Sequence, residues 1–159
     1  MHEYIERVVD LTDPTETELL NLTPGEARQR MLANSPETLR DFDGSFALVA
    51  KDGKSVKLAR SLDRPLRYFL AKQIEGPALI VAHRIDAIRQ WLEEQGFDDQ
   101  FHPYYTRMVP AHYLVTIQLV GCPDPDPTYE RFFNPVRNKY STDLEPIGRN
   151  YITALKNEV

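Results

Sequence analysis

The sequence of 159 residues contains a single cysteine, Cys122. One cysteine cannot form an intrachain disulfide, and it excludes a metal site built from four thiolates. The four histidines are His2, His83, His102 and His112, and no two of them stand at the i,i+4 spacing typical of a helical zinc site. We therefore expect neither a structural disulfide nor a bound metal or other cofactor.

Long apolar runs and clusters of basic residues are also lacking. No apolar segment approaches the ~20 residues that a membrane-spanning helix requires. The formal net charge is −5 and the Lys and Arg residues are dispersed, which disfavours binding to nucleic-acid phosphates. The segment Met1–Glu6 carries acids where a signal peptide would be basic. These features predict a soluble, cytoplasmic protein with neither a membrane nor a nucleic-acid partner.

Glycine is scarce, and its seven copies stand singly. The chain therefore has no glycine-rich loop whose successive backbone N–H groups could cradle a phosphate. Ser45, His83 and Asp86 could be combined on paper into a triad, but the Gly-x-Ser-x-Gly signature of a strained nucleophile turn is missing. We regard that triad as a coincidence and assign no catalytic residue.

The first part of the chain repeats a pattern typical of helix starts. Asp13-Pro14, Thr23-Pro24 and Ser35-Pro36 each place a capping side chain immediately before a proline. The pattern predicts helices over 14–21, 24–33 and 36–40, and hence a helical N-terminal segment over residues 1–42.

After Gly44 the pattern changes to short apolar and alternating runs, which predict a β-sheet region over residues 43–135. The expected strands are 45–50, 55–60, 66–71, 78–82, 113–119 and 129–133, with a helix over 84–95. The turn at Asp52-Gly53 predicts a hairpin with one face in water. The predicted fold class is α+β, an antiparallel sheet with packed helices. Its expected core is Phe46, Leu48, Leu58, Phe69, Ile80 and Val81, covered by Ile85, Ile88 and Leu92.

The remaining residues, 136–159, are expected to form a linker and an amphipathic helix within the same single domain. Apolar side chains at Ile147, Tyr151, Ile152 and Leu155 gather on one side of that helix. We expect this stripe to form a protein interface with a partner chain or a second copy. The aromatic segment containing Phe101 and Tyr104 either packs as a loop under the sheet or contributes to that interface.

Several segments, taken in order, resemble the amidotransferase domain of asparagine synthetases. Glu37–Ala47 leads from a helix through a glycine into a Phe-Ala strand, as in that family. Leu58–Ser61 is similar to the family's next strand, which ends in Ala-Arg-Asp, and Arg64–Phe69 is similar to a basic residue followed by Pro-Leu and paired aromatics.

The resemblance continues to the end of the chain. Leu79–Ile88 is similar to the family's Ala-Ser-Glu strand end and following helix. Met108–Leu114 is similar to its Val-Pro-Pro-Gly turn, and Tyr129–Pro135 to the aromatic segment that leads out of the domain. The final helix corresponds to the first helix of the family's second, ATP-using domain. The chain is thus identified as similar to a class II glutamine amidotransferase domain of the N-terminal-nucleophile (Ntn) type.

This resemblance implies an αββα sandwich, of which the chain would supply one sheet fully and the other in part. It also implies that the nucleophile segment and the ATP-binding domain of the family are missing. Residue 2 is His2, which offers no thiol or hydroxyl to be activated by a terminal amine, and Cys122 lies in a proline-rich connector. Within the resembling region, Ser61 replaces an acid and His83-Arg84 replaces Ser-Glu.

The leading functional hypothesis is a non-catalytic, amidotransferase-like companion that binds and orients an asparagine synthetase-like, ATP-using partner. A second hypothesis is that the chain is one piece of a split or longer glutamine-dependent amide ligase. A third is a stand-alone scaffold or ligand-binding module.

Overall fold

The computed structural model describes residues 7–33, 35–71, 78–119, 127–134 and 142–158, and all structural statements concern these residues. Cys122 and its connector therefore lie outside the described part of the chain. The elements, in chain order, are β1 (Arg7–Asp10), η1 (Pro14–Glu16), β2 (Glu18–Leu19), α1 (Pro24–Leu32), η2 (Pro36–Asp41), β3 (Gly44–Ser45), β4 (Ala47–Asp52), β5 (Ser55–Arg60), β6 (Arg67–Ala71), β7 (Ala78–Ala82), α2 (Ile85–Glu94), η3 (Asp98–Gln100), η4 (Pro103–Tyr105), β8 (Arg107–Met108), β9 (Tyr113–Gln118), β10 (Thr128–Arg131) and α3 (Leu144–Glu158).

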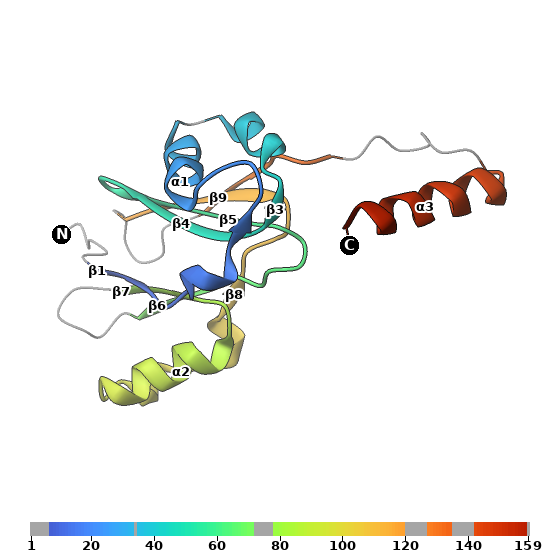
Figure 1. Ribbon diagram of the computed structural model, residues 1–159. Helices are drawn as coiled ribbons and strands as arrows, with labels where there is room; N and C mark the ends of the chain where they lie inside the picture. The colour runs from blue at the N-terminus through green and yellow to red at the C-terminus, as the bar shows by residue number, and fades with distance from the viewer. Residues whose placement is uncertain (1–6, 34, 72–77, 120–126, 135–141, 159) are drawn as a thin grey trace.

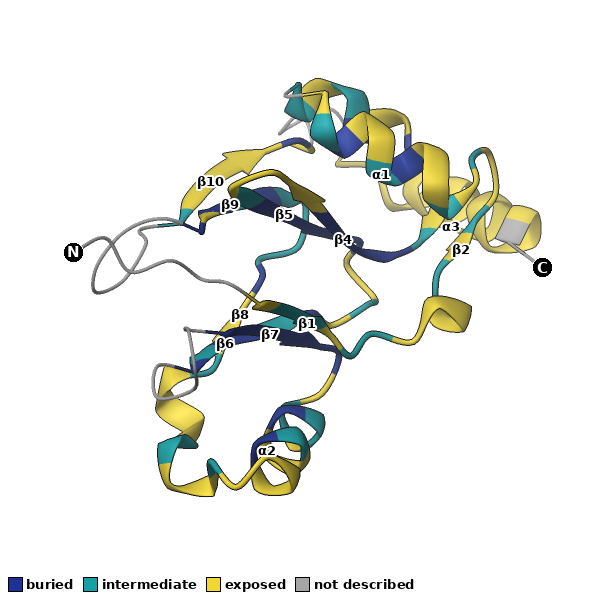
Figure 2. Cartoon of the chain, turned by 90° about the vertical axis from the view of Figure 1, so that its left-hand side faces the viewer, coloured by how far each residue is buried: buried dark blue, intermediate teal, exposed yellow. Residues whose placement is uncertain are grey.

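The elements before α3 are arranged in four layers, shown edge-on in Figure 2. Helix α1 covers a four-stranded sheet of order β10-β9-β5-β4, which faces a second four-stranded sheet of order β1-β7-β6-β8, and α2 covers the outer side of the second sheet. All pairings are antiparallel except that of β1 with β7, which is parallel. The predicted α+β fold with antiparallel sheets and packed helices is confirmed.

The period-two alternation of strand side chains divides the core into three clusters. Between the two sheets lie, among others, Val56, Leu58, Leu79 and Val81. The intervening residues point the other way. Leu48, Ala59 and Leu114 pack with Ala27 and Met31 of α1, whereas Phe69 and Ile80 pack with Ile88 and Leu92 of α2. Both sheets are thus covered on both faces.

The expectation that the β4–β5 hairpin keeps one face in water is wrong. Lys57 occupies a polar position on that face, yet its side chain is only 4% exposed. Its Nζ donates to the carbonyl of Met31 at 3.1 Å, close to the C-terminus of α1. A cation stabilises carbonyls that have no partner within the helix and opposes the negative end of the helix dipole. Lys57 therefore fastens α1 to the sheet.

The N-terminal segment is only partly helical. Helix α1 begins as predicted, with Thr23 and Glu26 forming a reciprocal capping box, and a 3₁₀ helix occupies 36–41. The helix expected over 14–21 is wrong beyond Glu16, because β2 pairs there with β3. Strand β1, which was not predicted, pairs with β7 and completes the second sheet. Residues 7–19 therefore supply strands that the resemblance alone did not account for.

Other sequence-based expectations agree with the structure. Strands β5 and β7 match the predicted ranges, and β4, β6, β9, β10 and α2 differ from them by one or two residues at their ends. The two-residue strands β2, β3 and β8 were not predicted. The predicted core side chains are buried, except for Ile85, which is half-buried. None of the helices in the described residues is both long and apolar enough to cross a membrane.

Candidate functional site

Helix α3 carries the residues predicted to form a protein interface. Asp143 precedes the helix and its carboxylate accepts a hydrogen bond from the backbone N–H of Glu145 at 3.2 Å, as a helix-capping side chain does. Glu145 also pairs with Arg149 one turn later, at 2.8 Å. These local interactions explain where the helix starts and how its first turns are supported.

The apolar side chains of α3 are exposed to solvent. Ile147 is 40% exposed, Tyr151 65%, Ile152 54% and Leu155 49%. Every residue of α3 whose side chain is described is exposed, and Figure 1 shows the helix standing apart from the two sheets. The four residues that the sequence placed on one side of the helix therefore form one solvent-exposed surface. We call this surface the α3 stripe.

The two other predicted interface residues lie elsewhere. Phe101 is half-buried, and its ring lies 6.3 Å from that of Phe69 in the core under α2. Tyr104 is 84% exposed and packs edge-on against Tyr105, with ring centroids 5.9 Å apart. In Figure 1 the turn η4 lies on the α2 side of the molecule, away from α3. The structure does not bring Phe101 and Tyr104 together with the α3 stripe.

A polar cluster that the sequence did not predict lies where the loop after β5 meets β3. The hydroxyl of Ser61 accepts a hydrogen bond from the backbone N–H of Phe46 at 2.9 Å and donates one to the carboxylate of Asp63 at 2.5 Å. Ser45 also donates to Asp63. Burial raises the pKa of the Asp63 carboxyl, but the hydrogen bonds from Ser45 and Ser61, helped by the charge of Arg64, outweigh burial and leave that pKa below its ordinary value.

The same cluster extends to the N-terminal segment and to the end of β7. Arg64 donates from Nε to Ser45 at 2.7 Å and lies 3.7 Å from the carboxylate of Glu16. The other neighbour of Glu16 is His83, whose Nε2 lies 3.8 Å from the same carboxylate oxygen. Ser45 and His83 thus belong to one cluster, whereas Asp86 pairs with Arg84 at 2.8 Å. This arrangement is not a catalytic triad.

The chemistry available to this cluster is limited by its hydrogen bonds. Ser45 donates to the carboxylate of Asp63 and accepts from the guanidinium of Arg64, so its hydroxyl is engaged on both sides within the cluster. Among the residues that the structure describes, no group of three or more His, Cys, Asp or Glu side chains could hold a metal ion. The cluster is therefore best understood as a junction between η1, β3, the loop after β5 and β7.

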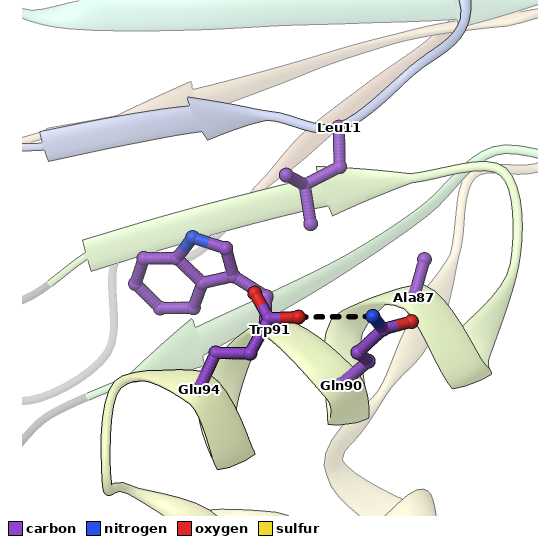
Figure 3. A pocket seen from close by; sticks show the side chains of 5 residues that line it. All are labelled: Leu11, Ala87, Gln90, Trp91 and Glu94. Atoms are coloured by element: carbon purple, nitrogen blue, oxygen red, sulfur yellow. Dashed lines mark hydrogen bonds between the residues drawn. The ribbon is translucent and has the colours of Figure 1, made fainter.

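A shallow pocket of about 200 Å³ lies against α2, lined by Leu11, Ala87, Gln90, Trp91 and Glu94. Figure 3 shows Gln90 and Glu94 hydrogen-bonded to each other, at 2.9 Å. The guanidinium of Arg7 lies 5.4 Å from the centroid of the Trp91 ring. Because Gln90 and Glu94 already pair with each other, their side chains do not mark this pocket as a ligand site.

Comparisons with protein-family models, with curated proteins and with solved structures find no match to this chain. The resemblance to asparagine synthetases therefore rests on the residues quoted for it above. His112 has a φ of 64°, a left-handed conformation that favours glycine.

Proposed function

We propose that this protein is a non-catalytic companion domain that binds a partner protein through the α3 stripe. The partner is a chain similar to the ATP-using domain of asparagine synthetases, which the companion holds and orients. The observation that carries the proposal is the exposure of Ile147, Tyr151, Ile152 and Leu155 along one side of α3.

The energetics of an isolated helix favour burial of the α3 stripe against a partner. A helix of about 15 residues is marginal in water on its own, because nucleation is costly and propagation gains little per residue. Gly148, in the interior of α3, costs a further ~1 kcal/mol relative to alanine. Burying the α3 stripe would stabilise the bound state by roughly 25 cal/mol for each Å² of apolar surface removed from water. Docking would therefore stabilise both the helix and the complex.

The choice of partner rests on the resemblance. In the resembling family the corresponding helix belongs to the second, ATP-using domain, whose core covers its apolar side. A separately encoded domain of that kind would offer a matching apolar groove. The non-catalytic role rests on the sequence, because no residue in it could be matched to the family's nucleophile or to its Ser-Gly-Gly phosphate loop. A cytoplasmic location is part of the same proposal.

The test is a double substitution, Ile152→Asp with Leu155→Asp, compared with Thr153→Asp and Asn157→Asp. At about 100° per residue, Thr153 and Asn157 lie on the opposite side of α3, so the control adds the same charge to the same helix. We expect the first variant to weaken binding to a synthetase-like domain encoded beside this chain by at least about tenfold, measured by calorimetry. The control should bind as the unmodified protein does.

Light scattering of the protein alone separates the remaining outcomes. If the protein forms a homodimer that the stripe substitutions disrupt and the control substitutions do not, the partner of the α3 stripe is a second copy of this chain and not a synthetase-like domain. A protein that remains monomeric and binds no such domain would contradict the proposal. Glutamine hydrolysis by the complex, lost on alkylation of a thiol in the partner, would favour the split-enzyme hypothesis instead.

A further inference from the structure

His83 directly follows the last residue of β7, and only 8% of its surface is exposed. Its Nδ1 lies 3.0 Å from the carbonyl oxygen of Pro65. Because a carbonyl oxygen can only accept, Nδ1 must carry the hydrogen of this bond. The bond therefore fixes which nitrogen of a neutral imidazole is protonated, leaving Nε2 with a lone pair.

The Nε2 atom of His83 is buried and has no hydrogen-bond partner. Its nearest charged neighbour is the carboxylate of Glu16, at 3.8 Å. In the neutral imidazole a lone pair would face a carboxylate, and a buried acceptor would remain unsatisfied, which is costly. In the imidazolium both nitrogens donate, so His83 would bond Pro65 and Glu16 at once.

Charged groups near His83 come from η1 and its cap, from the loop after β5 and from the next residue in the chain. Glu16 belongs to η1 and Asp13 caps that helix, with its carboxylate within electrostatic reach of His83. Arg64, from the loop after β5, lies on the other side of Glu16 at 3.7 Å. Arg84 is directed away, towards Asp86. Glu16 is 45% exposed, so its side chain has room to move the short distance to a charge-assisted bond.

We propose that protonation of His83 fastens the N-terminal segment to the end of β7 through Glu16. The segment runs beside β7 as β1, continues with a bond from Leu11 N to Val81 O at 2.8 Å, and crosses the strand end at η1. The His83–Glu16 contact is thus a pH-sensitive clasp on an edge strand of the second sheet. Histidine is the side chain whose charge ordinarily changes between about pH 5 and 8. This inference is independent of the proposed function.

The clasp can be tested by nuclear magnetic resonance on the whole protein. Long-range ¹⁵N spectra recorded through a pH titration should show neutral His83 as the Nδ1–H tautomer and report directly when it becomes imidazolium. Amide exchange in the same samples measures the contact with Glu16. The N–H groups of Glu16 and Thr17 donate to the carbonyls of Asp13 and Pro14. Their protection relative to β5 amides should rise about three- to fivefold when His83 becomes imidazolium.

The decisive comparison is between Glu16→Gln and Glu18→Gln. Both remove one exposed carboxylate from the same segment, but only Glu16 faces His83. The rise in protection should disappear in Glu16→Gln and persist in Glu18→Gln. A His83 that carries its neutral proton on Nε2 would overturn the proposal, as would the same rise in protection in both variants.

Discussion

Among single residues, Gly44 is the described glycine with the closest neighbours. Its φ is 124°, and a Cβ atom there would overlap the backbone carbonyl oxygen of Glu18 in the neighbouring strand β2. The overlap could be avoided only if β2 moved away from β3. Because the overlapping atom is a backbone oxygen, a change of side-chain rotamer cannot remove the overlap.

We expect Gly44→Ala to lower the free energy of unfolding by more than about 2 kcal/mol, because it combines backbone strain with the loss of a strand pair. Gly53→Ala is the control. Gly53 has a φ of 52° with open space around it, so alanine there should cost only about 1 kcal/mol. Urea unfolding curves of the two variants provide the measurement, and equal losses would contradict the assigned contact.

Ser61 and Arg60 hold the loop after β5. The hydroxyl of Ser61 donates a hydrogen bond to the carboxylate of Asp63 at 2.5 Å and accepts one from the backbone N–H of Phe46. Arg60 donates to the carbonyls of Val109 and Arg64. These hydrogen bonds tie the loop to the backbone between β3 and β4 and to the residue that follows β8.

At the scale of elements, the two outer layers depend on apolar side chains that point away from the space between the sheets. Phe46 lies under α1 with Phe42 and Phe132 around its ring, and Ile80 lies under α2. Phe46→Ala and Ile80→Ala should each cost about 2–5 kcal/mol, the usual range for a large buried side chain replaced by alanine.

The matched control is Tyr104→Ala, because Tyr104 is also a large side chain but is 84% exposed. Its loss should change the free energy of unfolding by less than about 0.5 kcal/mol. Thermal and chemical unfolding of the three variants would check the layer assignment. A loss below about 0.5 kcal/mol for Phe46→Ala or Ile80→Ala would mean that the corresponding layer does not pack as described.

At the scale of the whole molecule, α3 is separable from the four-layered body. Every described side chain of α3 is exposed, and the helix stands apart from the sheets in Figure 1. Deleting residues 142–159 should therefore change the free energy of unfolding of the body by less than about 0.5 kcal/mol, as followed by near-ultraviolet circular dichroism. A loss of about 2 kcal/mol or more would show that α3 packs on its own domain, and the proposed partner interface would lose its basis.

Much of the local structure could be predicted from the sequence. The Asp-Gly turn, with a short apolar run before it and an alternating run after it, predicted β4 and β5, and the residues Thr23 and Glu26 predicted the start of α1. The apolar spacing of Ile147, Tyr151, Ile152 and Leu155 likewise predicted the α3 stripe. These features could be predicted because strand alternation, helix capping and helical periodicity depend on residues close together in the chain.

The way these elements combine could not be predicted from the sequence. Lys57 was expected to face water, but it is buried because α1 lies over the sheet and offers carbonyl acceptors from residues 26 positions away. The helical start at Asp13-Pro14 gives way to β2 because β3 supplies hydrogen-bond partners. His83 and Glu16 meet only because β1 runs parallel to β7. Each outcome depends on a contact between distant parts of the chain, and local propensity contains no information about such contacts.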